Sequence, residues 1–575
     1  MHARDIVHRR RVVGLVFAVL LVSPTLVTAG PSAAAPLPSL FDPPAAVGGS
    51  APSARHGVQG RATVRQRPVT ARRGLLTRPD ESPALGVGDR LHLNLFDDAG
   101  FSLTVNDVTR HSGRGHTWSG TLDGVDLGYA VLAAHDGALV GHVSMPGAVY
   151  RIGYAPDGTQ VVEEIDQAAL PPEGHDVVPS LPAVAEDPTV GAEVPGVAAE
   201  STIPIDVMVL YTAAARTAAG GTAAMRAEVN LAVATTNQAY QNNNLAQRLR
   251  LVFAGEVSIT ESDFSSELDG LQVNPTVDWL RNVSRADLVS LITDHGPSSP
   301  FCGIAYRIRT NSTAYAPFGF SVVERVCASS NLTFAHELGH NMGAHHDAYV
   351  AGSAPTMFPY SYGYVDPVGK FRTIMAYPDL CLDSGFFCNK IPFFSTPGTT
   401  QNGRPIGTAA TADNARTLSQ TVATIASFRQ AATAPLTITT GVNKVTFAVG
   451  ETLVASVGLS NPGIAVTADI YLGLLRPDGT ATFFTDVVGT GAGGFVVGNI
   501  LSFATYRPIV AGVSLGAPVA ADFPSFLSLQ RTSGDQAGGF VWFLLAVTSG
   551  ALRDGILAPN ELLGASFSPF TFSSN

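Results

Sequence analysis

The pattern of hydrophobic and polar positions predicts strands in one part of the chain and a mixture of strands and helices in the next. Between residues 86 and 168, short runs alternate apolar and polar side chains, for example at 91–95 and 149–152, and Asp-Gly and Pro-Gly turns separate them. A period of two is typical of half-buried strands joined by tight turns. This segment is therefore predicted to be a small β-rich unit.

An α/β domain is predicted for residues 204–432. The apolar run at 205–211 is typical of a strand buried in a sheet, and apolar spacings of three and four predict a long helix over 225–240. Further strands are predicted at 249–257 and 286–292, and a helix at 412–428. Alternation of the two element types favours an α/β fold.

Residues 433–575 lose the helical periodicity and contain β-rich runs at 444–449, 467–475 and 540–546. They are predicted to form a separate β-sandwich accessory domain. Such a domain could bind a cell-surface or carbohydrate ligand or extend the scaffold, and no aromatic cluster decides between these roles.

Two segments have compositions that predict no packed core. Residues 30–85 are rich in Ala, Pro, Arg and Gly, and we interpret them as a leader or flexible spacer. Residues 169–203 carry repeated prolines, which predicts an exposed linker and a natural site for activation cleavage.

The first 29 residues are typical of a secretory signal peptide. Arginines precede an apolar stretch at 12–27, which Pro24 interrupts, and small residues follow. A membrane anchor is the alternative, but the stretch is short for one. We therefore expect a secreted protein without a membrane span in its mature form.

Composition supports packed domains and narrows the class of partner. Of the 575 residues, 45% are hydrophobic and 14% charged, and the mean hydropathy of +0.20 argues against wholesale disorder. The formal net charge is −11, and no long basic run follows the extreme N-terminus. Nucleic acid is therefore not an expected partner.

Four cysteines lie in the middle of the chain, at Cys302, Cys327, Cys381 and Cys388. An even number in an exported protein indicates disulfides, and the absence of C-x-x-C spacing argues against a cysteine-only zinc site. Three connectivities are open, of which we favour 302 with 327 and 381 with 388.

The chemistry is concentrated in the string H-E-L-G-H-N-M-G-A-H-H at residues 336–346. His336 and His340 are four apart, so on a helix both imidazoles reach one metal ion. Gly343 permits a sharp turn that returns His346 to the same ion. Three protein ligands leave a position open, which is typical of catalytic rather than structural zinc. Asn331 or Thr333 could cap this helix.

A bare H-E-x-x-H arises by chance, and single histidines are usually satisfied surface or core residues. The extended spacing and a Met-containing segment about thirty residues later make chance a poor explanation. His345 adjoins a proposed ligand but falls outside the spacing, so a solvent-facing or supporting role is expected.

This stretch resembles the metzincin zinc peptidases, and Asp347 after His346 resembles their reprolysin (adamalysin-like) branch. Residues 303–306 resemble the edge strand against which substrate lies antiparallel. Residues 373–377 resemble the Met-turn, with Met375 under the zinc. Tyr377 departs from reprolysins and is similar to the astacin and serralysin arrangement, in which the tyrosine approaches the metal.

The resemblance covers about residues 203–430 and implies a mixed, mostly parallel sheet with an active-site helix. It implies an endopeptidase with one catalytic Zn²⁺, with Glu337 as the general base toward the attacking water and Tyr377 as a hydrogen-bond donor to the oxyanion. The flanking parts look like the propeptide and β-sandwich appendage of bacterial relatives, so a zymogen is expected. Latency would come from steric cover of the cleft or from a group near Glu173, His175 or Asp176.

Proteins or peptides are the expected substrates. A structural Ca²⁺ is compatible with the sequence but not indicated by it. Two other classes remain open: a catalytically inactive metzincin-like binding or adhesion module, and a zinc amidase or deacetylase.

Overall fold

The computed structural model describes residues 36–43, 62–80, 82–111, 114–155, 157–179, 202–429, 436–485, 494–516, 518–558 and 560–574. The signal peptide expected at 1–29 lies outside these ranges, as does most of the linker segment expected to be cleaved. Pro38–Asn575 form one compact unit. Among the described residues, no helix combines the length and apolar character needed to cross a membrane.

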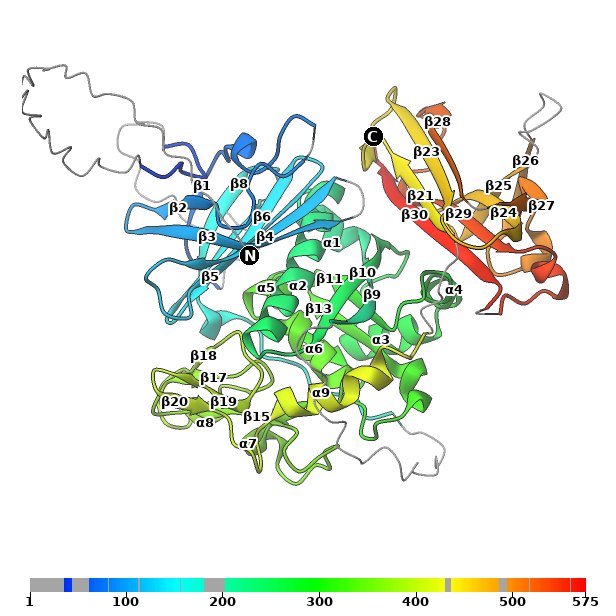
Figure 1. The fold of residues 1–575 in the computed structure, drawn as a ribbon. Helices are drawn as coiled ribbons and strands as arrows, with labels where there is room; N and C mark the ends of the chain where they lie inside the picture. Colours follow the sequence, from blue (N-terminus) through cyan, green and yellow to red (C-terminus); the bar gives the residue numbers. More distant parts are fainter. Residues whose placement is uncertain are drawn as a thin grey trace, which may run out of the picture. The chain divides into compact units, whose positions relative to one another are not determined.

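The N-terminal part is an eight-stranded antiparallel sheet in the order β1-β8-β7-β6-β5-β4-β3-β2 (Figure 1). Its strands are β1 (Thr63–Pro68), β2 (Arg90–Phe96), β3 (Ala99–His111), β4 (Gly115–Leu122), β5 (Tyr129–His135), β6 (Ala138–Met145), β7 (Ala148–Tyr154) and β8 (Gln160–Ile165). The β-rich character predicted for 86–168 is therefore present.

The flexible spacer predicted for residues 30–85 is wrong in part. Strand β1 closes one edge of the sheet against β8, and Leu40 and Phe41 are fully buried in the sheet's core. The sequence hides β1 because most of its residues are polar and its one aliphatic residue, Val64, is exposed, so no apolar face marks the strand. Arg65 finds its partners only across the sheet, at Glu164 (2.5 Å) and Asp98 (2.8 Å).

The central part is α/β with a mixed, mostly parallel sheet. Strands β10, β9, β11 and β13 are parallel neighbours, and β12 pairs antiparallel with β13 at the edge. The elements are β9 (Ile203–Tyr211), α1 (Ala213–Ala218), α2 (Thr222–Asn242), β10 (Gln247–Glu256), α3 (Phe264–Val273), α4 (Pro275–Ser284), β11 (Leu288–Thr293), β12 (Gly303–Ala305), β13 (Phe320–Glu324), α5 (Cys327–Ser330), α6 (Thr333–Asn341) and α9 (Asn414–Ile425).

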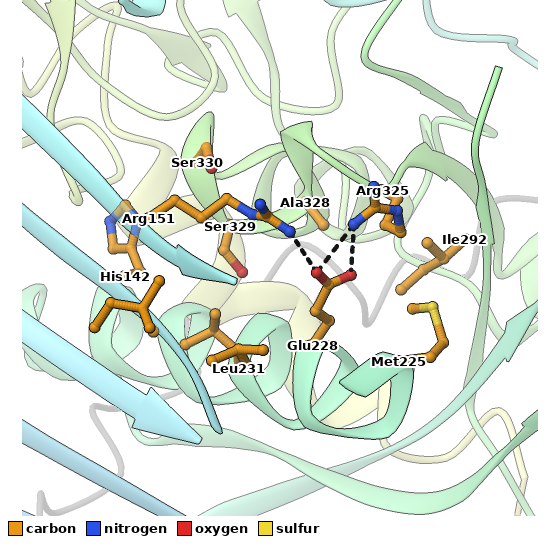
Figure 2. Close-up of a pocket in the computed structure, with 13 residues that line it drawn as sticks. His142, Arg151, Met225, Glu228, Leu231, Ile292, Arg325, Ala328, Ser329 and Ser330 are labelled. Atoms are coloured by element: carbon orange, nitrogen blue, oxygen red, sulfur yellow. Dashed lines mark hydrogen bonds and ion pairs between the residues drawn. The ribbon is translucent and has the colours of Figure 1, made fainter. Parts of the chain in front are cut away.

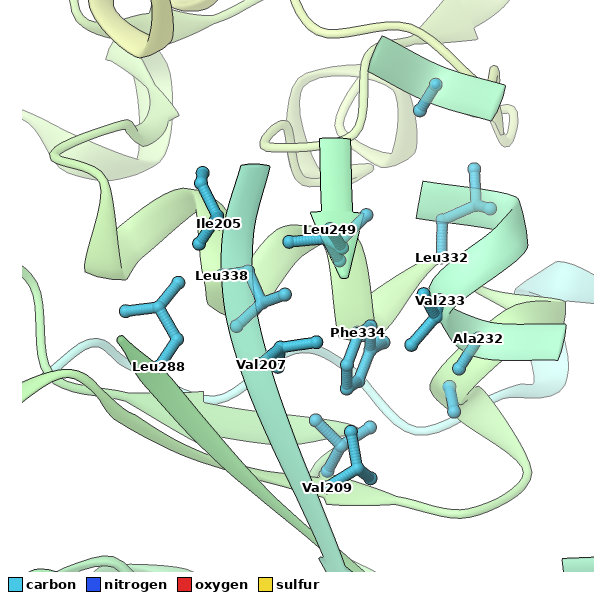
Figure 3. Packing of buried hydrophobic residues seen from close by; sticks show 14 of the residues in the cluster. Ile205, Val207, Val209, Ala232, Val233, Leu249, Leu288, Leu332, Phe334 and Leu338 are labelled. Atoms are coloured by element: carbon cyan, nitrogen blue, oxygen red, sulfur yellow. The ribbon is translucent and has the colours of Figure 1, made fainter. Parts of the chain in front are cut away.

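The buried core between this sheet and its helices fixes the orientation of α6. Val207 and Val209 of β9 pack in one cluster with Phe334 and Leu338 of α6 (Figure 3). These two α6 side chains are one helical turn apart, so they share the face that meets the sheet. Residues two positions away along α6 therefore point elsewhere, toward the site described below.

Between α6 and α9 the chain forms short elements. They are β14 (His345–Asp347), α7 (Ala348–Ala351), β15 (Tyr362–Gly363), β16 (Val365–Asp366), β17 (Phe371–Arg372), α8 (Asp379–Leu382), β18 (Asn389–Lys390), β19 (Thr396–Gln401) and β20 (Arg404–Ile406). They pair as β14-β15, β16-β17-β18 and β19-β20.

The C-terminal part contains two sheets, β21-β23-β28 and β22-β30-β29-β24-β25-β26, with β27 paired to β24. Its strands are β21 (Thr437–Val442), β22 (Thr446–Phe447), β23 (Thr452–Asn461), β24 (Val466–Leu475), β25 (Thr480–Thr485), β26 (Gly494–Asn499), β27 (Val510–Leu515), β28 (Val519–Gln530), β29 (Gly538–Thr548) and β30 (Leu562–Phe572). Residues of both sheets share one buried cluster, which includes Leu453 and Trp542. The β-rich prediction agrees with these strands, although the run at 444–449 forms only the two-residue β22.

Candidate active site

Three imidazoles converge at the C-terminal end of α6. His336 and His340 project from the same side of the helix, and Gly343 turns the chain with a φ of +89° so that β14 brings His346 back. His340 Nε2 lies 3.1 Å from His336 Nε2 and 2.9 Å from His346 Nε2. All three side chains are buried, and the three form a group that could hold a metal ion.

The outer nitrogens of two of these rings define their tautomers. His336 Nδ1 donates to the carbonyl of Ile374 at 2.8 Å, and His340 Nδ1 donates to the carbonyl of Ala344 at 3.0 Å. Their Nε2 lone pairs therefore face one another, which is unfavourable unless a cation sits between them. Burial lowers the pKa of all three histidines well below the usual range, so they are neutral, as metal ligands must be. This donor set fits a divalent metal such as zinc.

Glu337 lies between the first two ligands in sequence and is buried beside them. Neither of its carboxylate oxygens has a hydrogen-bond partner among the described residues. Burial raises its pKa well above the usual range, and the negative charge of Glu173 acts in the same direction. A buried carboxylate without a protein partner needs a ligand or water there, which fits a base beside a metal.

Residues 373–377, which resemble a Met-turn, pack against α6. A Cβ at Gly339 would stand 2.5 Å from Met375 Sδ, so only glycine allows this close approach. Arg372 Nη1 donates to the carbonyl of Ala376 at 2.7 Å and braces the turn. The Tyr377 backbone N–H donates to Asp347 Oδ2 at 2.9 Å, which ties the turn to the strand that carries His346.

Both disulfides have the favoured pairing, Cys302–Cys327 and Cys381–Cys388. The first joins the start of the edge strand β12 to α5, just before the active-site helix. The second closes a short loop after the Met-turn.

Residues 171–179, called the strap below, run along the free edge of β12. Gly174 N donates to the carbonyl of Gly303 at 2.9 Å, Val177 N donates to that of Ala305 at 2.9 Å, and Arg307 N donates to that of Val177 at 2.7 Å. The pairing is parallel. The exposed linker predicted for 169–203 is therefore wrong over these residues, because the edge of β12 satisfies their backbone groups.

The strap lies beside the candidate base and Tyr377. A Cβ at Gly303 would stand 2.7 Å from Glu337 Oε1, so the strand that carries the strap touches the candidate base. Tyr377 Oη donates to the carbonyl of Gly174 at 2.7 Å. The strap thus occupies the edge where a peptide could pair with β12.

Glu173 and Asp176 of the strap both enter the site, whereas His175 is exposed. Asp176 Oδ2 accepts a hydrogen bond from Arg307 Nε at 2.6 Å, and Asp176 Oδ1 lies 3.8 Å from His346 Nδ1. That distance is too long for a hydrogen bond. His345 is buried rather than solvent-facing, with Nδ1 3.6 Å from Asp176 Oδ1.

Asn331 and Thr333 do not cap α6, contrary to the prediction. The cap position belongs to Leu332, in the left-handed conformation with a φ of 55° and without a side-chain capping bond. The two side chains instead donate to the Glu173 carboxylate, Asn331 Nδ2 at 2.9 Å and Thr333 Oγ1 at 3.0 Å. Their hydrogen bonds therefore hold the strap in place and do not cap the helix.

Lys390 is the site residue that sequence reasoning missed. Its ammonium pairs with the Glu173 carboxylate, and its side chain is fully buried. A signal was present, because the chain contains only three lysines and this one follows Cys388 closely. Burial lowers the pKa of Lys390 to about 8, with a further contribution from the nearby charge of Arg372.

A buried ionic cluster joins the N-terminal sheet to the central domain (Figure 2). Arg151 of β7 donates to Glu228 of α2 at 2.6 Å, and Arg325, just after β13, donates to the same carboxylate at 3.0 Å. Glu163 and Asp294 are the second partners of the two arginines, at 2.7 and 2.6 Å.

These features are those of a metallopeptidase: three converging imidazoles, a buried carboxylate beside them, and a sheet edge that pairs with a peptide segment, here the strap. Residues 201–379 match the model of metallo-peptidase family M12, whose members are zinc-dependent.

Two bacterial relatives are each named peptidyl-Asp metalloendopeptidase. The protein from Xanthomonas campestris pv. campestris is 35% identical over 327 residues, which cover 55% of this chain and 74% of that protein. The protein from Stenotrophomonas maltophilia (strain K279a) is 33% identical, over 53% of this chain and 72% of that protein. The chain belongs to the family of these metalloendopeptidases, and it is itself a metalloendopeptidase.

Likeness to solved structures is low. The crystal structure of metalloproteinase-II from Bacteroides fragilis is 12% identical, with a TM-score of 0.29 over 45% of this chain and 81% of that chain.

Proposed function

We propose that this protein is a secreted zinc endopeptidase, made as a zymogen, that cleaves peptide bonds next to aspartyl residues. The observation that carries the proposal is the convergence of His336, His340 and His346 beside the partnerless carboxylate of Glu337, under a strap of the same chain. The names of the relatives support the endopeptidase activity and the aspartyl preference.

His336, His340 and His346 would hold the zinc ion through Nε2. Zinc bound there supplies a Lewis acid, which makes water more acidic and polarises a carbonyl group. Glu337 takes the proton of the attacking water on its carboxylate and later delivers it to the leaving amine.

The backbone of β12 positions the substrate. Its edge offers the carbonyls of Gly303 and Ala305, which the strap uses here, as acceptors for the N–H groups of an extended peptide. Tyr377 Oη, which donates to a carbonyl of the strap, would donate to the oxyanion in the reaction.

Latency follows from the place of the strap. As long as residues 171–179 pair with β12, a substrate cannot pair with the same edge. Release requires cleavage after the strap, in the part of the linker that lies outside the described residues, and separation of the N-terminal sheet. The cluster of Arg151, Glu228 and Arg325 supports this account, because it holds the N-terminal sheet on the central domain.

An inactive binding module is the less favoured alternative, because the three candidate ligands lie together and the candidate base is buried beside them. A zinc amidase or deacetylase is also less favoured, because the edge of β12 pairs through its backbone with a nine-residue segment of the chain, as it would with an extended peptide substrate. A cell-surface or carbohydrate ligand of the C-terminal sheets is still only an expectation from the sequence.

The test is the activity of the exported protein before and after processing. The intact precursor should hydrolyse casein slowly, and cleavage after residue 179 should raise the rate. A precursor as active as the processed form would contradict the zymogen. A processed form that releases acetate or cell-wall amide products but cuts no protein would favour the other enzyme classes.

A further inference from the structure

Three buried polar side chains close to the candidate base bind a carboxylate of the strap. We call Lys390, Thr333 and Asn331 the acid pocket. The Glu173 carboxylate pairs with the Lys390 ammonium and accepts hydrogen bonds from Asn331 Nδ2 at 2.9 Å and Thr333 Oγ1 at 3.0 Å. The Lys390 side chain is 0% exposed and that of Glu173 3%.

The acid pocket is next to the point where peptide bonds would be cut. Thr333 lies one helical turn before Glu337 on α6. The residue after Glu173, Gly174, is held by the carbonyl of Gly303 and by Tyr377 Oη. Gly303 in turn touches Glu337. A peptide that lies on β12 with its reacting carbonyl at the metal site therefore has a neighbouring side chain at this pocket.

The direction in which a substrate runs along β12 decides whether this neighbouring side chain precedes or follows the scissile bond. The strap runs parallel to β12, whereas substrate is expected to run antiparallel to it. An antiparallel peptide passes from the Tyr306 end of β12 to the Gly303 end. The acid pocket is at the Gly303 end, so it receives the side chain that follows the scissile bond.

The charge of the pocket requires an acidic occupant once the strap has left. Without Glu173, the buried ammonium of Lys390 has Arg372 as a repelling neighbour, and Glu337 is the attracting carboxylate that remains. A buried cation without a close partner is costly, as are buried donors without an acceptor. The carboxylate of a substrate side chain replaces what Glu173 supplied, whereas a neutral side chain leaves these groups unpaired.

We propose that Lys390, with Thr333 and Asn331, selects an acidic side chain immediately after the scissile bond, and that Glu173 holds the same pocket as a built-in substitute for it. This inference rests on the proposed endopeptidase function and adds the residues that read the substrate. A site built to pair a polar group discriminates strongly against an isostere that lacks it, so we expect at least about 100-fold selection of Asp over Asn.

The experiment uses the processed enzyme and a series of quenched fluorescent peptides that differ only after the scissile bond, at Asp, Glu, Asn or Lys. Mass spectrometry identifies the bond that is cut. For Lys390→Met, kcat/KM for the Asp peptide should fall about 100-fold, while that for the Asn peptide stays within about threefold. Lys390→Glu should favour the Lys peptide over the Asp peptide.

Lys444→Met is the matched control. Lys444 also forms an ion pair with a glutamate, Glu451, but it belongs to the C-terminal part. The same substitution there should leave the rates for all four peptides unchanged. Equal metal content and thermal unfolding of the two variants show that the loss at Lys390 is not a folding defect.

A second measurement needs no change to the enzyme. A synthetic peptide of residues 171–179 should inhibit the processed enzyme competitively, and its Glu173→Gln version should bind about 100-fold more weakly. Equal inhibition by the two peptides would overturn the role of the acid pocket.

The outcomes distinguish a failure of the proposed endopeptidase function from a failure of the acid pocket. If the wild-type enzyme cuts none of the peptides and no casein, the endopeptidase function fails. If it cuts them without regard to the acidic residue, or if Lys390→Met keeps the preference for Asp over Asn, the function stands and the acid pocket fails. Cleavage after Asp instead of before it would overturn the assigned direction.

Discussion

The ion cluster between the N-terminal sheet and the central domain makes a quantitative prediction about latency. Arg151 Nη2 lies 2.6 Å from Glu228, and the two side chains are 10% and 11% exposed. Arg151→Met removes the cation that the N-terminal sheet contributes to this contact. Glu228 keeps Arg325 at 3.0 Å, so its carboxylate is not left without a partner.

The free-energy cost of Arg151→Met should lie at the lower end of the range for breaking a buried ion pair. Truncating one member of a buried, hydrogen-bonded charge pair costs about 2–5 kcal/mol, much of it from the partner left unpaired. Because Arg325 remains, we expect about 2 kcal/mol for the docking of the N-terminal sheet. Since 1.4 kcal/mol is tenfold in an equilibrium, the fraction of undocked precursor should rise about 30-fold.

The assay is the initial rate of peptide hydrolysis by intact precursor, with electrophoresis to show that the chain is uncut. Arg90→Met is the matched control, because Arg90 pairs with Asp123 within the same sheet and the two side chains are 50% and 31% exposed. An exposed pair is worth about 1 kcal/mol or less and does not cross the interface. A folded Arg151→Met precursor with wild-type latency would refute the reasoning.

Three further predictions concern the site and its support. Glu337→Gln should retain the metal and lower kcat by about 10²–10⁴-fold, and full activity would reject the base. Tyr377→Phe removes the hydrogen bond to the strap, so the precursor should leak activity, while an unchanged kcat of the processed enzyme would reject its role at the oxyanion. Burial lowers the pKa of His295, but hydrogen bonds to Glu267 and Glu324 outweigh it and raise that pKa to about 10. The stabilisation is complete below the unfolded value of about 6.5 and is lost as pH rises through about 10. Unfolding of the wild type should therefore become easier from pH 7 to 10 relative to His295→Gln, and parallel profiles would contradict this.

The sequence was sufficient where chemistry follows from local spacing. The four-residue separation of His336 and His340 needs only a helix to bring two imidazoles together, and Gly343 supplies the positive φ that returns His346. The apolar run at 205–211 became β9 because a strand covered on both faces needs no alternation. Those predictions depend only on residues that are close together in the sequence.

The local sequence pattern does not predict contacts between residues that only the tertiary structure brings together. Glu173 and Lys390 are 217 residues apart, and nothing in the local pattern of either indicates the other. Asn331 and Thr333 have the residue types of helix caps, yet a carboxylate from the strap competes for their hydrogen bonds. The strap itself has the proline-rich composition of a linker, and it is ordered because β12 offers an unpaired edge.

The central claim is that a metal held by His336, His340 and His346 supports peptide-bond hydrolysis. The most direct measurement is metal content and casein hydrolysis of the processed enzyme, with and without a chelator, followed by addition of Zn²⁺. The account predicts about one zinc ion per chain, loss of cleavage on chelation and recovery with Zn²⁺. Cleavage that persists after the metal has been removed, or stoichiometric zinc without any cleavage of protein, would contradict it.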